Sequence, residues 1–283
     1  MALVAAAAVL MAALFLLFKI FDRREVPLLP AIAVNYVVAL LSGLLFAPPW
    51  RGGDLSGLWM PAIGLGMFFV INFYLTGLST QRAGVAATTV ASRMSLVLTV
   101  IAAVLLYNER PGLAGWIGIA CAIAGVALSS LVKDPGGMRY AWKLPVLIFF
   151  GNAVIDIGIN WVQRTRLDAA NEEVFPTITF MSAAVVSVAL ALRREGSAVF
   201  KRSSVWIGGS VLGVVNYAAL VMIVKALSKG GFPASSFYPL MNVGVILIGT
   251  IASMILFRER LRSMQLIGIA FAIASLLLIL YAR

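Results

Sequence analysis

The pair Glu109-Arg110, followed by Trp116-Ile-Gly-Ile-Ala-Cys-Ala-Ile-Ala124, returns 150 residues later as Glu259-Arg260, followed by Leu266-Ile-Gly-Ile-Ala-Phe-Ala-Ile-Ala274. Because the pair and the string keep the same spacing, we interpret the chain as two copies of one unit. Each copy is almost entirely hydrophobic, so the two copies are expected to meet inside a bilayer. Paired membrane repeats usually hold a transport site between them.

The composition excludes several classes of protein. The chain is 62% hydrophobic and 12% charged, with a mean hydropathy of +1.02, so lipid must cover much of its surface. It has no histidine and a single cysteine, Cys121, which argues against a disulfide framework and a thiolate or imidazole metal site. We expect no cofactor. The net charge of +11 comes from basic residues that stand singly or in pairs between apolar segments, so we expect no nucleic-acid partner.

Ten apolar segments have about the 20 residues that a helix needs to cross the hydrocarbon, and each is bounded by charges, Pro or Gly. The expected spans are 2–19, 30–47, 58–79, 84–107, 112–132, 144–162, 174–192, 204–227, 232–257 and 263–282. The chain is therefore predicted to be an all-α polytopic membrane protein with about ten transmembrane helices. The connections are too short for a soluble catalytic domain, and we predict that the protein is not an enzyme.

The ten spans divide into a first repeat, residues 1–134, and a second repeat, residues 135–283. Five spans is an odd number, so the second copy enters the membrane from the opposite side and the repeat is inverted. Two inverted copies of one scaffold can exchange conformations and open a shared central site to alternate faces. Together they are expected to form one transporter domain.

Two short motifs support a family resemblance. Tyr107-Asn-Glu-Arg-Pro111 follows span 4 and Phe257-Arg-Glu-Arg-Leu261 follows span 9. With ten spans in a five-plus-five repeat, the chain resembles the drug/metabolite transporter superfamily, in its EamA-like branch. The resemblance implies a secondary transporter of small organic solutes. It also implies a cavity lined by spans 1 to 4 and 6 to 9, with spans 5 and 10 at the periphery.

Span 6 carries polar residues at membrane depth. Asn152, Asp156 and Asn160 recur every four residues and so share one helical face. Asp156 is expected about 18 Å into a hydrocarbon core of roughly 30 Å. A carboxyl group at that depth suits the uptake and release of a proton during transport, although an Asp held permanently by hydrogen bonds or a salt bridge is the alternative.

Span 4 places Arg93, with Ser92 beside it, about 14 Å from the start of the span. Arginine keeps its proton and binds carboxylate or phosphate through two parallel hydrogen bonds. Arg93 could bind an anionic group of the substrate, act as a fixed counter-ion to Asp156, or extend toward lipid headgroups. If both charges face the cavity, Arg93 and Asp156 could together hold a zwitterion such as an amino acid.

The second copy is expected to be polar at the same depth. With the offset of 150, Ser92 corresponds to Asn242 and Thr89 to Pro239. Pro239 is expected to break the helix and expose a carbonyl at cavity depth. Tyr238 and Asn242 are further substrate-binding candidates on the same span.

Other polar and small residues have two interpretations each. Asn72 and Asn216 are candidates for substrate binding, but a single asparagine in a span more often joins two helices. Glu109 and Glu259 are expected to form structural ion pairs or to interact with helix N-termini. Spans 5 and 10 are expected to pack closely through small residues, namely Gly115, Gly118, Ala122 and Gly125 in one and Gly268, Ala272 and Ser275 in the other.

Two arguments about orientation disagree. The odd-numbered connections carry fourteen Lys and Arg residues, whereas the even-numbered connections and the C-terminus carry seven. The positive-inside rule therefore places the odd connections in the cytoplasm and both termini outside. The family resemblance implies cytoplasmic termini. The expected location is the plasma membrane, a bacterial or archaeal inner membrane that the chain crosses many times.

These observations favour a secondary transporter of a small polar metabolite, zwitterionic or anionic, that works by alternating access, with proton coupling as an open possibility. The expected partners are the small-molecule substrate, protons where transport is coupled to them, and membrane lipids, in a monomer or a homodimer. One alternative is a flippase for a lipid-linked or phospholipid headgroup, whose phosphate Arg93 would bind. Another is a membrane assembly protein that transports nothing.

Overall fold

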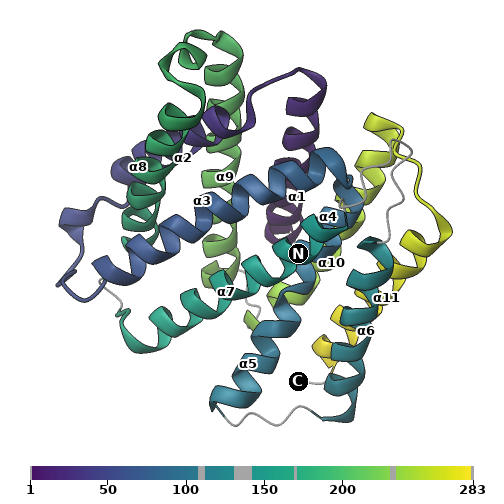
Figure 1. The fold of residues 1–283 in the computed structure, drawn as a ribbon. Coiled ribbons are helices and arrows are strands. Elements are labelled where there is room, and N and C mark those ends of the chain that lie inside the picture. The colour runs from purple at the N-terminus through teal and green to yellow at the C-terminus, as the bar shows by residue number, and fades with distance from the viewer. Residues whose placement is uncertain (1, 108–111, 131–141, 169–170, 230–233, 282–283) are drawn as a thin grey trace. The chain divides into compact units, whose positions relative to one another are not determined.

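A computed structural model describes residues 2–107, 112–130, 142–168, 171–229 and 234–281. Within these ranges the regular secondary structure is helical (Figure 1). The helices are α1 (Ala2–Arg23), α2 (Leu28–Phe46), η1 (Pro49–Arg51), α3 (Trp59–Arg82), α4 (Val85–Met94), α5 (Leu96–Tyr107), α6 (Leu113–Ser130), α7 (Lys143–Thr165), α8 (Phe175–Glu195), η2 (Ser197–Lys201), α9 (Ser203–Lys229), α10 (Ala234–Phe257) and α11 (Ser263–Tyr281).

The long helices confirm the all-α polytopic class. In the part of the chain that the structure describes, nine helical segments are long and apolar enough to cross a membrane, and α6 is a shorter apolar helix. Each lies on one of the ten expected spans. Span 4 differs from the expectation, because it was expected to be one helix over 84–107 and forms two helices, α4 and α5, that are separated at Ser95. The boundary expected between residues 134 and 135 falls outside the described residues.

The chain forms two compact parts, which we describe separately. The first part consists of residues 1–19, 75–153 and 219–283, and the second part of residues 20–74 and 154–218. The division does not follow the repeat, because each part takes helices from both copies. It passes through α3, α7 and α9 and near the end of α1, so these four helices contribute to both parts.

In the first part, α6 packs along α11, its counterpart in the other copy. A Cβ atom on Gly118 would lie 3.0 Å from Ile279, and one on Gly125 would lie 2.9 Å from the backbone nitrogen of Ala272. A Cβ atom on Gly268 would lie 2.5 Å from the backbone nitrogen of Ser129. Early residues of α6 thus meet late residues of α11, so the two helices are antiparallel. The expected close packing through small residues is confirmed.

Two further pairs of equivalent helices follow the same rule. In the second part, the end of α2 meets the start of α8, where the Thr177 hydroxyl donates to the Ala47 carbonyl at 2.9 Å. In the first part, a Cβ atom on Gly249 of α10 would lie 3.4 Å from the Thr89 hydroxyl oxygen of α4. Glu259, which follows the end of α10, lies beside Gly84 at the start of α4. These three pairs therefore pack antiparallel, which is the arrangement that an inverted repeat predicts.

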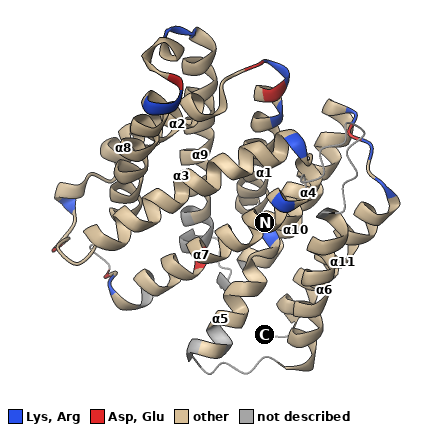
Figure 2. Ribbon diagram, in the orientation of Figure 1, with Lys and Arg blue, Asp and Glu red and all other residues tan. Residues whose placement is uncertain are grey.

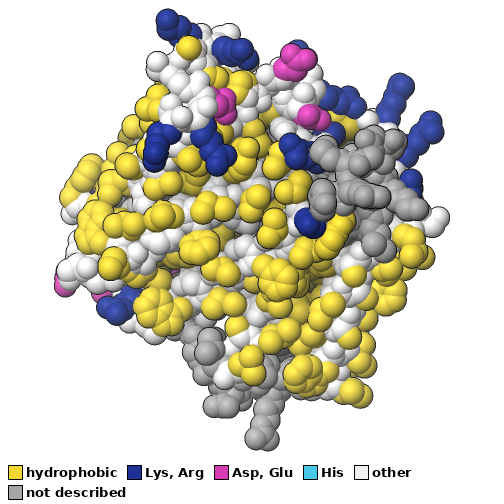
Figure 3. All heavy atoms as spheres, in the orientation of Figure 1, with side chains coloured by type: hydrophobic (Ala, Val, Ile, Leu, Met, Phe, Trp, Pro, Cys, Tyr) yellow, Lys and Arg dark blue, Asp and Glu magenta, His cyan; other side chains and the backbone are white. Residues whose placement is uncertain are grey.

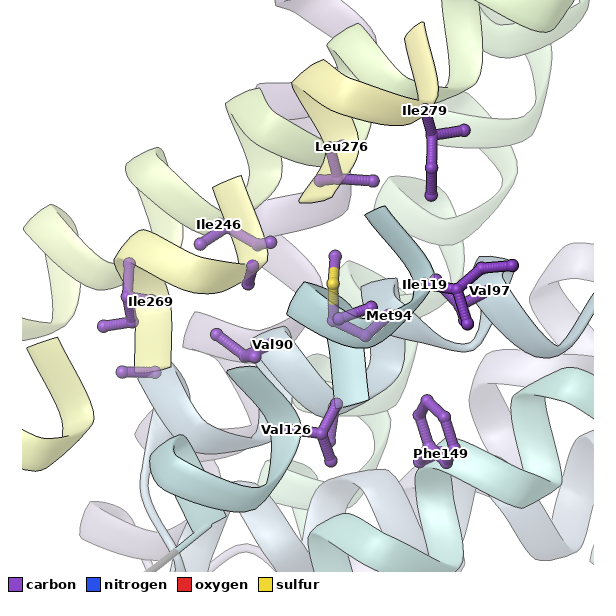
Figure 4. Packing of buried hydrophobic residues seen from close by; sticks show 14 residues of the cluster. Val90, Met94, Val97, Ile119, Val126, Phe149, Ile246, Ile269, Leu276 and Ile279 are labelled. Atoms are coloured by element: carbon purple, nitrogen blue, oxygen red, sulfur yellow. The ribbon is translucent and has the colours of Figure 1, made fainter. Parts of the chain in front are cut away.

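The core of the first part is an apolar cluster between α4, α6, α10 and α11 (Figure 4). Met94 is fully buried there, and Val90 and Ile246 point into the same space from α4 and α10. Leu276 and Ile279 close the cluster from α11. The second part has its own cluster, in which α3, α7 and α8 bury Leu58, Ala62, Leu65, Val162, Phe175 and Ile178.

When the connections are numbered by the span that they follow, odd-numbered connections contact one another in the first part and even-numbered ones in the second part. In the first part the Lys19 ammonium at the end of α1 donates to the Gln81 carbonyl at the end of α3, at 2.9 Å. In the second part the Gly53 amide, between α2 and α3, donates to the Asn171 side chain, between α7 and α8, at 2.9 Å. The first contact thus links the first and third connections, and the second contact links the second and sixth. Both contacts are as expected when successive helices cross a membrane in opposite directions.

Charged and apolar residues separate along the helices. Lys, Arg, Asp and Glu gather at helix ends and connections, with few inside the spans (Figure 2). Hydrophobic side chains cover the visible outer surface between them (Figure 3). Met60 on α3 is 83% exposed and Ile255 on α10 is 71% exposed. Apolar side chains on this scale need lipid rather than water around them.

Candidate functional site

The candidate site begins at the interruption between α4 and α5. The Ser95 hydroxyl donates to the Ser92 carbonyl at 2.8 Å, and the amides of Leu98 and Thr99 reach back to the Ser95 carbonyl at 2.9 and 3.2 Å. Ser95 keeps right-handed helical dihedral angles, φ −52° and ψ −28°, so α4 and α5 are separated only by a local change in hydrogen bonding. Arg93 lies two residues before Ser95.

Ser92 and Asn152, both predicted site residues, are brought together. The Asn152 side-chain amide donates to the Ser92 hydroxyl at 3.1 Å and to the Ile148 carbonyl of its own helix at 3.1 Å. Ser92 is only 7% exposed. The contact joins α4 of the first copy to α7 of the second within the first part of the structure. A polar link between the two copies therefore exists next to Arg93.

Arg93 is half-buried, between the buried residues Ser92 and Met94. Its guanidinium carbon lies 5.5 Å from the ring centre of Phe15 on α1, which is a cation–π distance. Phe15 was not predicted, because one aromatic residue in an all-apolar span carries no distinguishing signal. The partner found for Arg93 is thus a protein side chain, whereas a snorkelling arginine would meet lipid headgroups.

On α10, Asn242 is buried, and its side-chain oxygen has no hydrogen-bond partner among the described residues. Tyr238 is half-buried and packs against the cluster that contains Phe15 and Met241. The helix break expected at Pro239 is wrong, because α10 continues through this residue as an α-helix. Proline removes one backbone hydrogen bond, and neighbouring helices in a membrane bundle allow a helix to continue despite that loss.

Four predicted site residues lie in the second part. Asp156 and Asn160 are half-buried on α7, and the Asn160 side-chain oxygen has no hydrogen-bond partner among the residues that the structure describes. Asn72 is buried on α3. Asn216 donates to the Asn35 side chain at 3.3 Å and so joins α9 to α2. Because Arg93 belongs to the first part, its pairing with Asp156 stays a prediction.

A cleft of about 440 Å³ in the second part is lined by Ser56, Gly57, Met60, Pro61, Trp161 and Arg166. None of the predicted site residues lines it. No three His, Cys, Asp or Glu side chains are grouped as a metal site would require in the ranges that the structure covers. The candidate site is therefore defined by the polar contacts around α4.

Comparison with known proteins agrees with this architecture. Residues 1–131 match the model of the EamA-like transporter family. An uncharacterized protein of Haemophilus influenzae is 28% identical over 284 residues, which cover 95% of this chain and 94% of that protein. One solved crystal structure superposes with a TM-score of 0.61 at 18% identity, covering 98% of this chain and 94% of that one, and so shares the fold.

The family match falls on the copy that contains α4, Ser92 and Arg93, and it ends before the second copy begins. The resemblance inferred from the Glu-Arg motifs and the ten spans is thereby confirmed. Over residues 1–131 the chain is similar to the EamA-like transporter family, and its apolar helices make it a multi-pass membrane protein.

Proposed function

We propose that the protein is a secondary transporter that binds a small anionic or zwitterionic metabolite at α4. The family match supports transport of a small molecule in general. The anionic character of the substrate rests on Arg93, whose side chain stays charged at any physiological pH. A guanidinium recognises carboxylate or phosphate through two parallel hydrogen bonds, which gives both affinity and orientation.

The observation that carries this proposal is the hydrogen bond from Asn152 to Ser92, next to Arg93. Polar side chains inside membrane helices are expensive, so a cluster of them calls for a use. Here the hydroxyl of Ser92 meets an amide from the other copy, and the cation Arg93 is the next residue along α4. A substrate that replaced the Asn152–Ser92 bond could use the same donors without leaving a buried polar group unpaired.

Phe15 supports Arg93 in this role. A contact with the aromatic face lowers the cost of holding a cation among apolar side chains. It does not use the N–H donors of the guanidinium, which lie in the plane of the group. We infer that Phe15 holds Arg93 in position while leaving the geometry that an anion needs.

Asp156 and Asn160 extend the proposal to a zwitterion. They share one face of α7 with Asn152, so a substrate ammonium group could meet Asp156 while its carboxylate meets Arg93. Asp156 is also the proposed proton-coupling residue. In this view Asn72, Asn216, Tyr238 and Asn242 complete the substrate contacts from α3, α9 and α10.

The inverted repeat supports alternating access. Residues 1–134 and 135–283 would exchange conformations and open the site to each side in turn. The proposed location is a bacterial or archaeal inner membrane. For the orientation we retain the charge argument, which places both termini outside, because the odd connections are the more basic ones.

A proteoliposome experiment tests the proposal. Uptake of labelled anionic, zwitterionic and cationic solutes is measured with and without a pH gradient, for the unaltered protein and for Arg93→Lys. We expect saturable uptake of anionic or zwitterionic solutes only, weakened by the substitution. Transport of cations alone would overturn the anion site. Transfer of a fluorescent phospholipid between leaflets, without solute uptake, would favour the flippase.

A further inference from the structure

The connection between α10 and α11 folds back onto the start of α4. Arg258, the first residue after α10, has φ 54°, which is a left-handed conformation that non-glycine residues rarely adopt. This turn directs Glu259 toward the helix bundle, where its amide donates to the Ser253 carbonyl at 3.3 Å. An unfavourable backbone conformation persists only where other contacts stabilise it, and the Glu259 side chain makes such contacts.

The Glu259 carboxylate sits at the N-terminus of α4. It accepts hydrogen bonds from the amides of Val85 and Ala86. The Ser253 hydroxyl beside it donates to the Thr250 carbonyl at 2.8 Å. Those amides are among the first donors of α4, which have no partner within the helix, and the helix dipole favours a negative charge at that end. The predicted interaction of Glu259 with a helix N-terminus is therefore confirmed. Glu109, its counterpart, lies outside the described residues.

Gly84 makes room for this contact. Its φ is 95°, and a Cβ atom placed on it would overlap the Glu259 Oε1 atom. Any other residue at position 84 would meet both the backbone cost of positive φ and a collision with the carboxylate. The site is thus built from two sides, by Gly84 before α4 and by Arg258 after α10.

The two carboxylate oxygens differ in their surroundings. Oε2 is buried and has no hydrogen-bond partner among the described atoms. Burial is the largest influence and raises the pKa of Glu259 above its ordinary value, although Ser253, Lys19 and the two amides of α4 act in the opposite direction. An ionised oxygen without a donor is costly, and a proton on the carboxyl group removes that cost.

Among the described residues, the charged side chain that acts on Glu259 is basic. Lys19 of α1 acts on Glu259 electrostatically, while its ammonium donates to Gln81 at the end of α3. Arg82 on α3 and Arg258 and Arg260 beside Glu259 are exposed. Solvent screens these exposed arginines, so none of them replaces the missing donor at Oε2.

We propose that Glu259 is a proton-binding site, and that proton uptake there fastens the α10–α11 connection to the start of α4 while proton release frees it. Linkage gives the direction. A docked carboxyl that binds its proton more tightly than a solvated one must favour docking at low pH and release at high pH. The proton goes to Oε2, and Oε1 keeps the amides of α4.

The consequence for transport rests on the proposed function, since α4 also carries Ser92 and Arg93. Helix α4 would be held at one end by Glu259 in one protonation state and be free to move in the other. This gives the chain a proton-dependent element distinct from Asp156.

Hydrogen–deuterium exchange tests the docking without any transport measurement. Exchange of the amides at residues 85–88 is measured at pH 5 and pH 8 in the purified protein. Each rate is expressed as a protection factor, because intrinsic exchange changes with pH. We expect protection to be several-fold greater at pH 5. Glu259→Gln, which mimics the protonated acid, should give the same high protection at both values of pH.

Two further variants make the test decisive. Gly84→Ala keeps Glu259 but blocks its docking, so protection should be low at both pH values. This variant tests the docking independently, even if Glu259→Gln folds poorly. Glu109→Gln is the matched control from the other motif and should leave the pH dependence at residues 85–88 intact. Equal protection of the unaltered protein at both pH values, or an unchanged pH response in Glu259→Gln, would overturn the proposal. If the pH dependence of protection at residues 85–88 is as expected but the protein takes up no solute, the result counts against the proposed transport function and not against the proton-binding site.

Discussion

The amide of Asn152 on α7 donates to the hydroxyl of Ser92 on α4 across 3.1 Å, which joins the second copy of the repeat to the first. Hydrogen bonds between membrane helices contribute about 0.6 kcal/mol on average. We expect a double-mutant cycle of Ser92→Ala and Asn152→Ala to give a coupling energy of about 0.5–1 kcal/mol in the stability of the purified protein. Additive losses would mean that the contact adds nothing to stability.

Arg93→Lys tests recognition by the guanidinium. Lysine keeps the charge but loses the planar fork and the extended contact with Phe15, so substrate affinity should fall about tenfold. The protein should remain folded, which its thermal unfolding profile in detergent will report. Phe15→Leu is the matched variant. It removes the aromatic face and keeps Arg93, so its effect on affinity should be smaller than tenfold, about 0.5–1 kcal/mol.

Asp156→Asn separates proton coupling from folding. The amide keeps the shape of the side chain and cannot take up a proton, so uptake should no longer respond to a pH gradient while the protein still inserts and folds. Normal gradient-driven uptake by this variant would remove Asp156 from the mechanism. If Arg93→Ala prevents folding and Asp156→Asn restores it, the two residues form a structural ion pair and Arg93 is not the anion site.

The α6–α11 interface depends on close approach of the two backbones. Gly268→Ala would place a methyl group 2.5 Å from the Ser129 nitrogen and 2.9 Å from the Gly125 carbonyl oxygen. Because both neighbours are backbone atoms, we expect a loss of about 1–3 kcal/mol in stability. Gly64→Ala on α3 is the control, since nothing lies within 4 Å of its added carbon. It should be neutral or stabilising by up to about 1 kcal/mol.

Much of the architecture was accessible from the sequence because hydrophobic length and repeated spacing are strong signals. Ten apolar segments gave the spans, and the repeated Glu-Arg motifs gave the pairing of copies. The small residues of α6 and α11 predicted their contact, since few side chains other than Gly, Ala and Ser allow helices to approach so closely. The Glu259 motif also predicted an interaction with a helix N-terminus.

Local backbone geometry was harder to predict. Ser95 carries no proline or glycine signal, yet its hydroxyl takes the Ser92 carbonyl and the helix is interrupted there. Pro239 carries the strongest such signal, yet α10 continues through it. At Ser95 a local side-chain hydrogen bond decides the outcome, whereas at Pro239 the neighbouring helices of the bundle allow the helix to continue. The contact of Phe15 with Arg93 joins distant helices, and one sequence without related sequences gives no means of finding it.

The last prediction concerns the aqueous access that transport requires. Ser92 and Asn242 occupy equivalent positions of the repeat on α4 and α10, and both are buried in the structure, at 7% and 6% exposure. If alternating access opens a shared cavity between the copies, each position must meet water in some state. Ser92→Cys and Asn242→Cys, each in a Cys121→Ala background, should therefore react with a small water-soluble thiol reagent, and substrate should change the rate.

Lipid-facing positions supply the reference for this experiment. Ile123→Cys on α6 and Leu277→Cys on α11 replace side chains that are 51% and 48% exposed on apolar surfaces, which lipid would cover. They should react slowly and show no response to substrate, because a charged reagent does not enter the hydrocarbon. If Ser92→Cys and Asn242→Cys behave like these lipid-facing positions in every state, no shared aqueous cavity exists at α4 and α10, and the transporter proposal fails.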